Sequence, residues 1–395
     1  MKRIFTLLLI VFLSTVANAQ WTLCNKPAGV SPFSLMIYND TIYMGTLSNG
    51  IYRSTDGGTN WTQINNGITS LQIWAINQVG AAVFASSTSG NVYKSTDGGD
   101  NWTLSNTGIS STAIVKKFVS FNSKIFAATS NAGILISNDN GSSWAQHNTG
   151  IVGLVAGEIM VIENNLYAAV NNKRVYKYDS TNQNWIEKST GLPNQSIGCM
   201  TYIKDDLQNV TFFVGNGNNN DVAKSTNGGD NWSVSDIGLP NVGVYSLLGI
   251  GTTVYAGNDY GVYKTTDYGA NWIDISGFSN SSPAKFLSKS STDLYVVQEA
   301  KLWKKSLASL SIEDKDLGVQ IQNFKIYPNP SNGNFNIEVT ENLIDSKARI
   351  YTLLGQKIKE FNLNSTTTNQ NLNKGIYLLE IEKDGTKTSK KLIVN

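Results

Sequence analysis

The chain has 395 residues and carries 31 lysines and arginines against 29 aspartates and glutamates, so its formal net charge is only +2. A balance this even offers no electrostatic case for binding nucleic acid. A charged fraction of 15% together with 35 glycines favours a β-rich extracellular protein with many turns, and the length allows two or three domains.

Residues 1–19 predict a secretory signal peptide. Lys2 and Arg3 precede a short apolar run at 4–16, and Ala17-Asn18-Ala19 offers a cleavage site before Gln20. We therefore expect an exported mature chain. No other stretch is long and apolar enough to cross a bilayer, so no membrane span is expected.

Residues 20–305 repeat with a period of about 40–47 residues, the range typical of solenoids, propellers and arrays. Each period contains short β-branched and aromatic runs separated by Gly, Asn, Asp and Ser, which predict strands. In the second period these runs are 73–79, 82–86, 92–95 and 102–104.

An octapeptide precedes the fourth strand of most periods. Clear copies stand at 54–61, 95–102, 137–144, 225–232 and 265–272, and a degenerate copy stands at 178–185. Its third residue is usually Asp, whose side chain can accept hydrogen bonds from nearby backbone N–H groups in a turn. Its glycines permit positive φ. We expect the closing indole to cover its own hairpin.

The octapeptide resembles the Asp-box of the BNR repeat family, which includes sialidases and many proteins that are not sialidases. The resemblance covers residues 20–305. It implies a β-propeller in which the boxes lie at the blade edge away from the ligand face, and hence a structural role for the box residues. These are Asp56, Trp61, Asp97, Trp102, Asp139, Trp144, Trp232, Asp267 and Trp272.

The seventh period ends at 301–305 with no box and no fourth strand after it. Trp21-Thr22-Leu23 has the signature of a fourth strand, so we expect it to pair beside 301–305 and close the ring, which removes free sheet edges. The fold class predicted is therefore all-β, with a seven-bladed β-propeller closed by the N-terminal strand. An open arrangement of six or eight units is the alternative.

Ring closure also bears on the two cysteines. It would place Cys24 on the outer strand of blade 7 and Cys199 on the inner strand of blade 5. A disulfide needs Cα atoms within about 7 Å of each other, so we expect two free thiols.

Residues 306–322 break the repeat and predict a linker, and residues 323–395 predict a small Ig-like β-sandwich. Strand-like runs stand at 335–339, 348–352, 356–362, 375–383 and 387–394. This segment resembles the type A sorting domain of type IX secretion. The matching residues include Tyr327, Pro328, Asn329, Pro330, Gly355, Gly375, Tyr377 and Lys391. The resemblance implies recognition by an outer-membrane translocon, followed by release or surface attachment of the propeller. An ordinary Ig-like adhesive module is the alternative.

Sialidase chemistry, which the boxes suggest, needs three arginines around the substrate carboxylate. The chain has four: Arg3, Arg53, Arg174 and Arg349. Arg3 lies in the predicted signal peptide and Arg349 in the predicted sorting domain, so the triad cannot be built.

Box-containing xyloglucanases resemble the chain in repeat type but place their carboxylates between two propellers, and only one is predicted here. Glu158, Asp221 and Asp259 are candidate carboxylates, with no pair fixed by the sequence. Polysaccharide hydrolysis therefore stays as the alternative to a non-enzymatic role.

No metal or cofactor is expected. His147, the single histidine, should lie on the outer edge of blade 3. The Asn-rich run at 215–221 could supply oxygens to calcium, but a flexible loop is the favoured interpretation.

Aligning the first strands predicts a column of side chains at the channel mouth. It holds Phe33, Trp74, Lys116, Gly157, Tyr245 and Lys285, with Cys199 nearby. Aromatic and lysine side chains there could stack on sugar rings or anchor a protein. The alternative is that they only pack between blades.

The sequence thus predicts a monomeric, secreted or cell-surface, non-enzymatic propeller. It would bind a glycan or protein and be exported by the type IX translocon. A purely structural surface-layer role remains a third interpretation.

Overall fold

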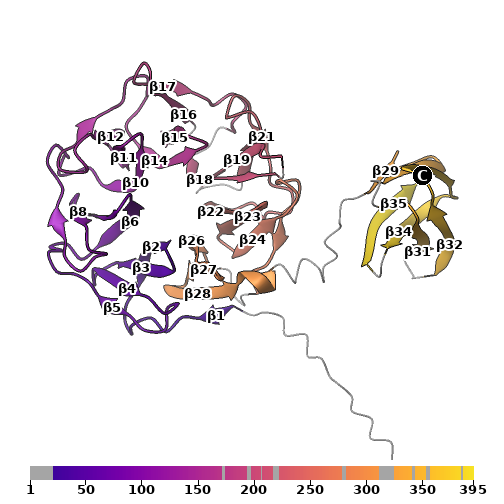
Figure 1. The fold of residues 1–395 in the computed structure, drawn as a ribbon, viewed down its shortest axis with the longest axis horizontal. Coiled ribbons are helices and arrows are strands. Elements are labelled where there is room, and N and C mark those ends of the chain that lie inside the picture. Colours follow the sequence, from indigo (N-terminus) through magenta and orange to yellow (C-terminus); the bar gives the residue numbers. More distant parts are fainter. Residues whose placement is uncertain are drawn as a thin grey trace, which may run out of the picture. The chain divides into compact units, whose positions relative to one another are not determined.

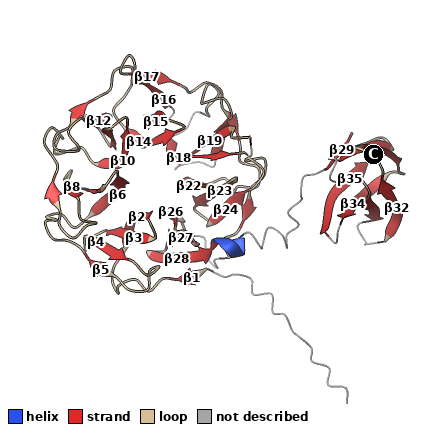
Figure 2. Cartoon of the chain, in the orientation of Figure 1, coloured by secondary structure: helices blue, strands red, loops and turns tan. Residues whose placement is uncertain are grey.

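The computed structural model describes residues 21–170, 174–193, 197–205, 207–216, 222–277, 282–310, 324–339, 343–352, 356–383 and 386–395. Strands dominate these residues, and a helical turn stands at 307–310 (Figure 2). No helix among them is long and apolar enough to cross a membrane. The chain divides into two compact units, Met1–Leu307 and Ala308–Asn395.

Seven four-stranded antiparallel sheets make up the described part of the first unit. Figure 1 shows them arranged around a central axis, with the first strand of each sheet innermost. Six sheets use consecutive strands: β2 (Pro32–Tyr38), β3 (Thr41–Thr46), β4 (Ile51–Ser54) and β5 (Thr62–Gln63); β6 (Ile73–Val79), β7 (Ala82–Ser87), β8 (Val92–Ser95) and β9 (Thr103–Leu104); β10 (Val115–Phe121), β11 (Lys124–Thr129), β12 (Ile134–Ser137) and β13 (Ala145–Gln146); β14 (Ala156–Ile162), β15 (Asn165–Val170), β16 (Arg174–Asp179) and β17 (Asn184–Glu187); β18 (Ile197–Lys204), β19 (Val210–Asn216), β20 (Val222–Ser225) and β21 (Ser233–Val234); β22 (Val244–Ile250), β23 (Thr253–Asn258), β24 (Val262–Thr265) and β25 (Ile273–Asp274).

The remaining sheet joins the two ends of the unit. Its order is β26 (Lys285–Lys289), β27 (Asp293–Gln298), β28 (Lys301–Ser306) and β1 (Thr22–Leu23). Thr22 pairs with Lys304 and Leu23 with Trp303. The pairing expected of the N-terminal strand is therefore confirmed.

The second strand of each sheet is buried on both faces, because neighbouring sheets pack against it. All six residues of β7 are buried, for example. Small residues make this close packing possible: a Cβ at Gly45 would lie 2.2 Å from Ser34 Oγ and 2.7 Å from a methyl of Ile73. The small residues that follow the aromatic residue in most of these strands thus reflect how closely the sheets approach.

The octapeptide turns form as expected around their aspartates. Asp97 accepts hydrogen bonds from Ser95 Oγ at 2.7 Å, from the Asn101 backbone N–H at 3.0 Å and from Asn101 Nδ2 at 2.8 Å. Asp56, Asp139 and Asp267 hold equivalent bonds. These bonds lower the pKa of Asp56 and Asp139 to about 2.

The tryptophans lie close to the glycines of their own turns, as Trp102 does to Gly99, and also make a bond that was not expected. Their indole N–H groups mostly do not cap their own hairpins but donate to the residue just after the outer strand of the preceding sheet. The acceptors are the carbonyls of Ile64, Ser105, His147, Lys188, Ser235 and Ile275, reached by Trp102, Trp144, Trp185, Trp232, Trp272 and Trp21. Each bond therefore ties two sheets together. Trp61 differs, because its indole bonds to Gly58 within its own turn at 3.2 Å.

The junction between the last sheet and the first is held by other contacts. Ser291 donates to both carboxylate oxygens of Asp40, at 2.6 and 2.9 Å. Lys304 Nζ donates to the Gly57 carbonyl at 2.9 Å, and the Asn25 N–H donates to the Gly58 carbonyl at 3.0 Å. This junction thus lacks the tryptophan bond found at the other six.

The described residues of the second unit form two sheets. One has the order β29 (Phe324–Tyr327), β30 (Asn334–Val339) and β33 (Thr367–Asn371). The other has the order β32 (Lys357–Leu363), β31 (Ser346–Thr352), β34 (Gly375–Lys383) and β35 (Thr386–Val394). A shared apolar core includes Phe335 and Ile337 from the first sheet and Ile350 and Leu379 from the second. Two strands, β29 and β33, were not expected from the sequence.

Candidate ligand-binding site

Every first strand of the first unit carries a β-bulge near its start, where its pairing with the second strand slips by one residue. A bulge leaves one residue unpaired and turns its side chain away from the regular alternation. In six sheets the unpaired residue is Phe33, Trp74, Lys116, Gly157, Gly198 or Tyr245. Five of these six are the residues predicted to line the channel mouth.

The seventh sheet corrects the predicted column. Lys285 pairs with Val297, and the bulge falls one residue later, at Phe286 and Leu287. Phe286 has a positive φ of 54°. Alignment of the first strands places Lys285 at the position equivalent to the other bulge residues. It could not show that the bulge of the seventh sheet lies one residue later. Phe286 therefore faces the centre in place of Lys285, whose Nζ lies 5.2 Å from the centre of the Tyr245 ring.

In the fifth sheet Cys199 was expected near the column, and it stands next to the bulge. The residue at the bulge is Gly198, whereas Cys199 pairs with Gly215 and is buried in the core between neighbouring sheets. Cys24 and Cys199 are both free and buried, as expected. Burial raises the pKa of Cys24 to about 11 and raises the pKa of Cys199 as well.

The bulges surround a central cavity of about 340 Å³ that receives residues from all seven first strands. Trp74, Lys116, Gly157, Tyr245 and Phe286 line it. Phe33 contacts Trp74 edge to face, with ring centres 5.2 Å apart. The structure thus brings the predicted aromatic residues to one place, from strands far apart in the sequence.

Two donor–acceptor pairs and one further lysine lie around this cavity. Lys117 Nζ is 3.5 Å from Glu158 Oε1. The Tyr245 hydroxyl donates to Asp259 Oδ1 at 2.8 Å, and burial with the Asp259 carboxylate raises the pKa of Tyr245. Lys116 is half-buried, and burial lowers the pKa of its ammonium group. Donors and acceptors therefore stand side by side around an aromatic wall.

The other candidate groups lie elsewhere. Asp221 and most of the Asn-rich run fall outside the described residues. His147 follows the outer strand β13, where its ring contacts the Tyr178 hydroxyl at 3.1 Å. Arg53 bonds to the Gly98 carbonyl and Asp100, and Arg174 bonds to Glu187. In the described part of the chain, no three His, Cys, Asp or Glu side chains gather as metal ligands would.

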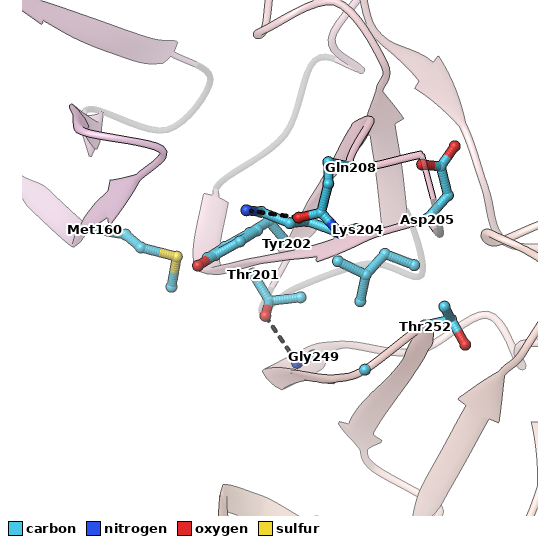
Figure 3. A pocket seen from close by; sticks show the side chains of 10 residues that line it. Met160, Thr201, Tyr202, Lys204, Asp205, Gln208, Gly249 and Thr252 are labelled. Carbon is cyan, nitrogen blue, oxygen red and sulfur yellow. Dashed lines mark hydrogen bonds between the residues drawn. The ribbon is translucent and has the colours of Figure 1, made fainter.

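A second, larger hollow of about 690 Å³ lies at the far ends of the first strands, between β18 and β22. Figure 3 shows Tyr202, Lys204 and Gln208 on one side and Thr252 on the other, with the Tyr202 hydroxyl directed toward Met160. Its charged groups already have partners: Lys204 pairs with Glu163, and Asp205 accepts from Asn209 N at 2.8 Å. Nothing in the sequence had singled out this hollow.

The predicted sorting motif comes together at one end of the second unit. Tyr327 ends β29 and is followed by Pro328, Asn329 and Pro330. Asn329 Oδ1 accepts a hydrogen bond from the Ile393 N–H at 2.9 Å, which ties this turn to the last strand. Gly375 begins β34, and the Tyr377 hydroxyl donates to the Asn373 carbonyl at 3.0 Å. Lys391 lies in β35, and Gly355 falls outside the described residues.

Two family models match the chain. Residues 325–395 match the secretion system C-terminal sorting domain, which implies export to the cell surface or secretion. Residues 72–226 match the DUF6242 β-propeller domain. No curated protein matches the chain.

Solved structures share the propeller fold at low identity. YCF48 from Cyanidioschyzon merolae is 13% identical, with a TM-score of 0.57 over 73% of this chain and 98% of its own. A further YCF48 structure, bound to D1 peptide, is 15% identical, with a TM-score of 0.58 over 72% of this chain and 96% of its own. Virginiamycin B lyase from Staphylococcus aureus is 13% identical, with a TM-score of 0.60 over 73% and 98%.

PorZ, a surface component of the type IX secretion system of Porphyromonas gingivalis, is 12% identical, with a TM-score of 0.53. The match covers 93% of this chain and only 60% of PorZ. Identities this low establish the fold and leave the ligand open.

Proposed function

We propose that this chain is a secreted or cell-surface, seven-bladed β-propeller that binds a glycan or protein ligand at the mouth of its central channel without turnover. Residues 1–19 would be a signal peptide, 20–305 the propeller and 306–322 a linker. Residues 323–395 would be an Ig-like sorting domain that directs export through the type IX translocon. The propeller would act as a monomer.

One observation carries the proposal. Bulge residues of six separate strands line a single cavity, and Phe33, at the bulge of the seventh, packs against Trp74; several of these residues are aromatic or cationic. Bulges are often found next to functional sites because they re-aim side chains. Concave sites with an aromatic wall and a few polar groups are typical of ligand binding.

Export by type IX secretion is supported by the family match at 325–395. The likeness to PorZ, itself a surface component of that system, is consistent with a place at the cell surface. The YCF48 structure with D1 peptide supports the protein or peptide class of ligand for this kind of propeller.

The second candidate is hydrolysis of a polysaccharide, and the carboxylates of Glu158 and Asp259 beside the cavity favour it. Each carboxylate is already engaged, by Lys117 and Tyr245 respectively. A glycosidase needs two carboxyl groups flanking the scissile bond, and of Glu158 and Asp259 only Glu158 lines the cavity. Binding without turnover therefore accounts better for the arrangement.

An array of glycans, polysaccharides and peptides tests the proposal, with the purified full chain applied and reducing-sugar release followed in the same wells. We expect specific binding without release, lost in Trp74→Ala and kept in Tyr202→Ala, which alters the other hollow. Sugar release would establish the hydrolase instead. Binding that ignores Trp74, or no binding at all, would refute a ligand site at the channel mouth.

A further inference from the structure

Among the described residues, Lys116 is the charged residue of the central cavity for which no partner is found. Three charged side chains line the cavity, Lys116, Lys117 and Glu158, and the last two pair with each other. Across the described part of the chain, no ion pair or hydrogen bond involves Lys116 Nζ. An ammonium group that is half-buried without a partner is costly, so an anion supplied by a ligand would be favoured there.

The two neighbours of Lys116 around the ring differ sharply. On one side lies Trp74, at the equivalent bulge, with Phe33 against its ring. On the other side the next two bulges carry Gly157 and Gly198, which have no side chains to fill the space. Around the ring, Lys116 therefore lies between an aromatic residue and two glycines of the described cavity wall, and a side chain at Gly157 would meet the Ile197 carbonyl at 2.9 Å.

We infer that this cavity binds a carboxylate-bearing sugar, such as a uronate within an acidic polysaccharide. Lys116 would receive the carboxylate and Trp74 would stack on the sugar ring. This inference rests on the proposed function and names the class of ligand for the same site.

The remaining polar groups suit a ligand rich in hydroxyls. The Lys117–Glu158 pair and the Tyr245–Asp259 pair each present a donor beside an acceptor, and sugar hydroxyls both donate and accept. A volume of about 340 Å³ is also that of a small-molecule site rather than of a long groove. An extended acidic peptide could satisfy Lys116, but it would not use these paired groups in the same way.

Titration calorimetry on the full chain tests the inference. The probes are trigalacturonate and triglucuronate, each compared with its methyl ester, which keeps the sugar and removes the charge. We expect an acid to bind at least about tenfold more tightly than its ester. Lys116→Met should weaken binding of the acid about 10–100-fold, and Lys116→Arg should retain most of it. Lys204→Met, at the far end of β18, is the matched control and should bind normally.

A melting curve separates loss of the site from loss of the fold. Because Lys116→Met removes an unpartnered, half-buried charge, we expect its melting temperature to equal or exceed that of the wild type. A lower melting temperature would show that Lys116 is structural and would overturn the inference.

The failures of the two proposals can be told apart. Equal binding of acid and ester, or normal binding by Lys116→Met, would refute an anionic sugar but leave a ligand site intact. If only neutral glycans or acidic peptides bind, and their binding still depends on Trp74, the anionic sugar is likewise refuted and the ligand site stands. If no array ligand depends on Trp74, the proposed function itself falls.

Discussion

At the scale of the residue, the octapeptide turn shows how a short motif specifies backbone geometry. The carboxylate of Asp97 collects backbone and side-chain donors that would otherwise face solvent. One clear copy of the octapeptide has asparagine at this position. Asn227 is the third residue of that copy, as Asp97 is of its own. Its Oδ1 accepts from Ser225 Oγ at 2.9 Å and from the Asn231 N–H at 3.0 Å. The turn therefore needs an acceptor oxygen, and a charge is a secondary requirement.

Replacing Asp97 tests this account. We expect Asp97→Ala to lower the melting temperature at pH 7, and Asp97→Asn to lower it less. Hydrogen bonds depress the pKa of the folded-state carboxyl. The stability contributed by the ionised Asp97 carboxylate is therefore fully present above the ordinary carboxyl pKa of about 4. It is lost as the pH falls through the lower pKa of this carboxyl in the folded state. The difference between wild type and Asp97→Asn should shrink between about pH 4 and pH 2. A constant difference across that interval would contradict the role of the charge.

The tryptophan bonds allow a second test between matched residues. Trp144 donates from a buried indole to Ser105 in the preceding sheet, whereas Trp61 bonds within its own turn. Trp144→Phe should reduce the free energy of unfolding by about 1 kcal/mol, and Trp61→Phe should reduce it less. Chemical denaturation measures both. A larger loss for Trp61→Phe would show that the bonds between sheets contribute little.

Sequence reasoning located the aspartates and glycines of the turn because their roles are local. It did not reveal the hydrogen-bond partner of the indole, which lies in another sheet some 37–44 residues away. It failed in the same way for Lys285, because the displaced bulge at Phe286 depends on packing between sheets. The partnerless state of Lys116 likewise could not be read from spacing alone.

At the scale of the element, sequence reasoning missed two strands, β29 and β33, both of which pair with β30. The strand β33 consists of Thr, Asn and Gln, and its side chains are exposed or half-buried. It forms by pairing with β30, and no local sequence pattern predicts this pairing. The strand β29 stands next to a Pro-rich segment that predicts turns. Backbone pairing with β30 therefore determines that both segments form strands.

The short strand β1 is the element on which ring closure depends. The junction it completes lacks the tryptophan bond present at the other six, so it should be the first to open. Deleting residues 20–25 should lower the melting temperature sharply, because it also removes the bond from Trp21 to Ile275. An unchanged melting temperature would refute closure by this strand.

Thiol labelling of the intact chain checks the same junction without a deletion. Cys24 follows β1 and Cys199 lies in the core, so in mild denaturant Cys24 should react first. Cys24→Ser and Cys199→Ser identify the two signals. Simultaneous labelling would show that the junction opens only with the whole unit.

At the scale of the whole molecule, the chain combines a repeated unit with a smaller one that differs in composition and topology. The repeat count, the closing strand and the change of pattern after residue 305 all follow from the sequence. The repeat period of the sequence reveals such an architecture because every sheet packs against its neighbours in the same way. The identity of the ligand does not follow from the sequence repeat. Single residues at the bulges of otherwise similar sheets determine which ligand can bind.

The second unit should be dispensable for the folding of the first but required for export. Deleting 324–395 should therefore leave a folded propeller in the periplasm of a host with type IX secretion. Cell fractionation, with circular dichroism of the recovered protein, measures both expectations. The same chain found outside the cell would contradict the sorting role.

The central claim is that seven bulges form one ligand site, and hydrogen–deuterium exchange tests it most directly. The full chain is compared with and without the glycan that gives the strongest array signal. We expect protection at the starts of several first strands together, including 32–37, 73–77, 115–119 and 244–248, and not in Lys116→Met. Protection confined to the hollow near Tyr202, or to the outer strands, would contradict the claim.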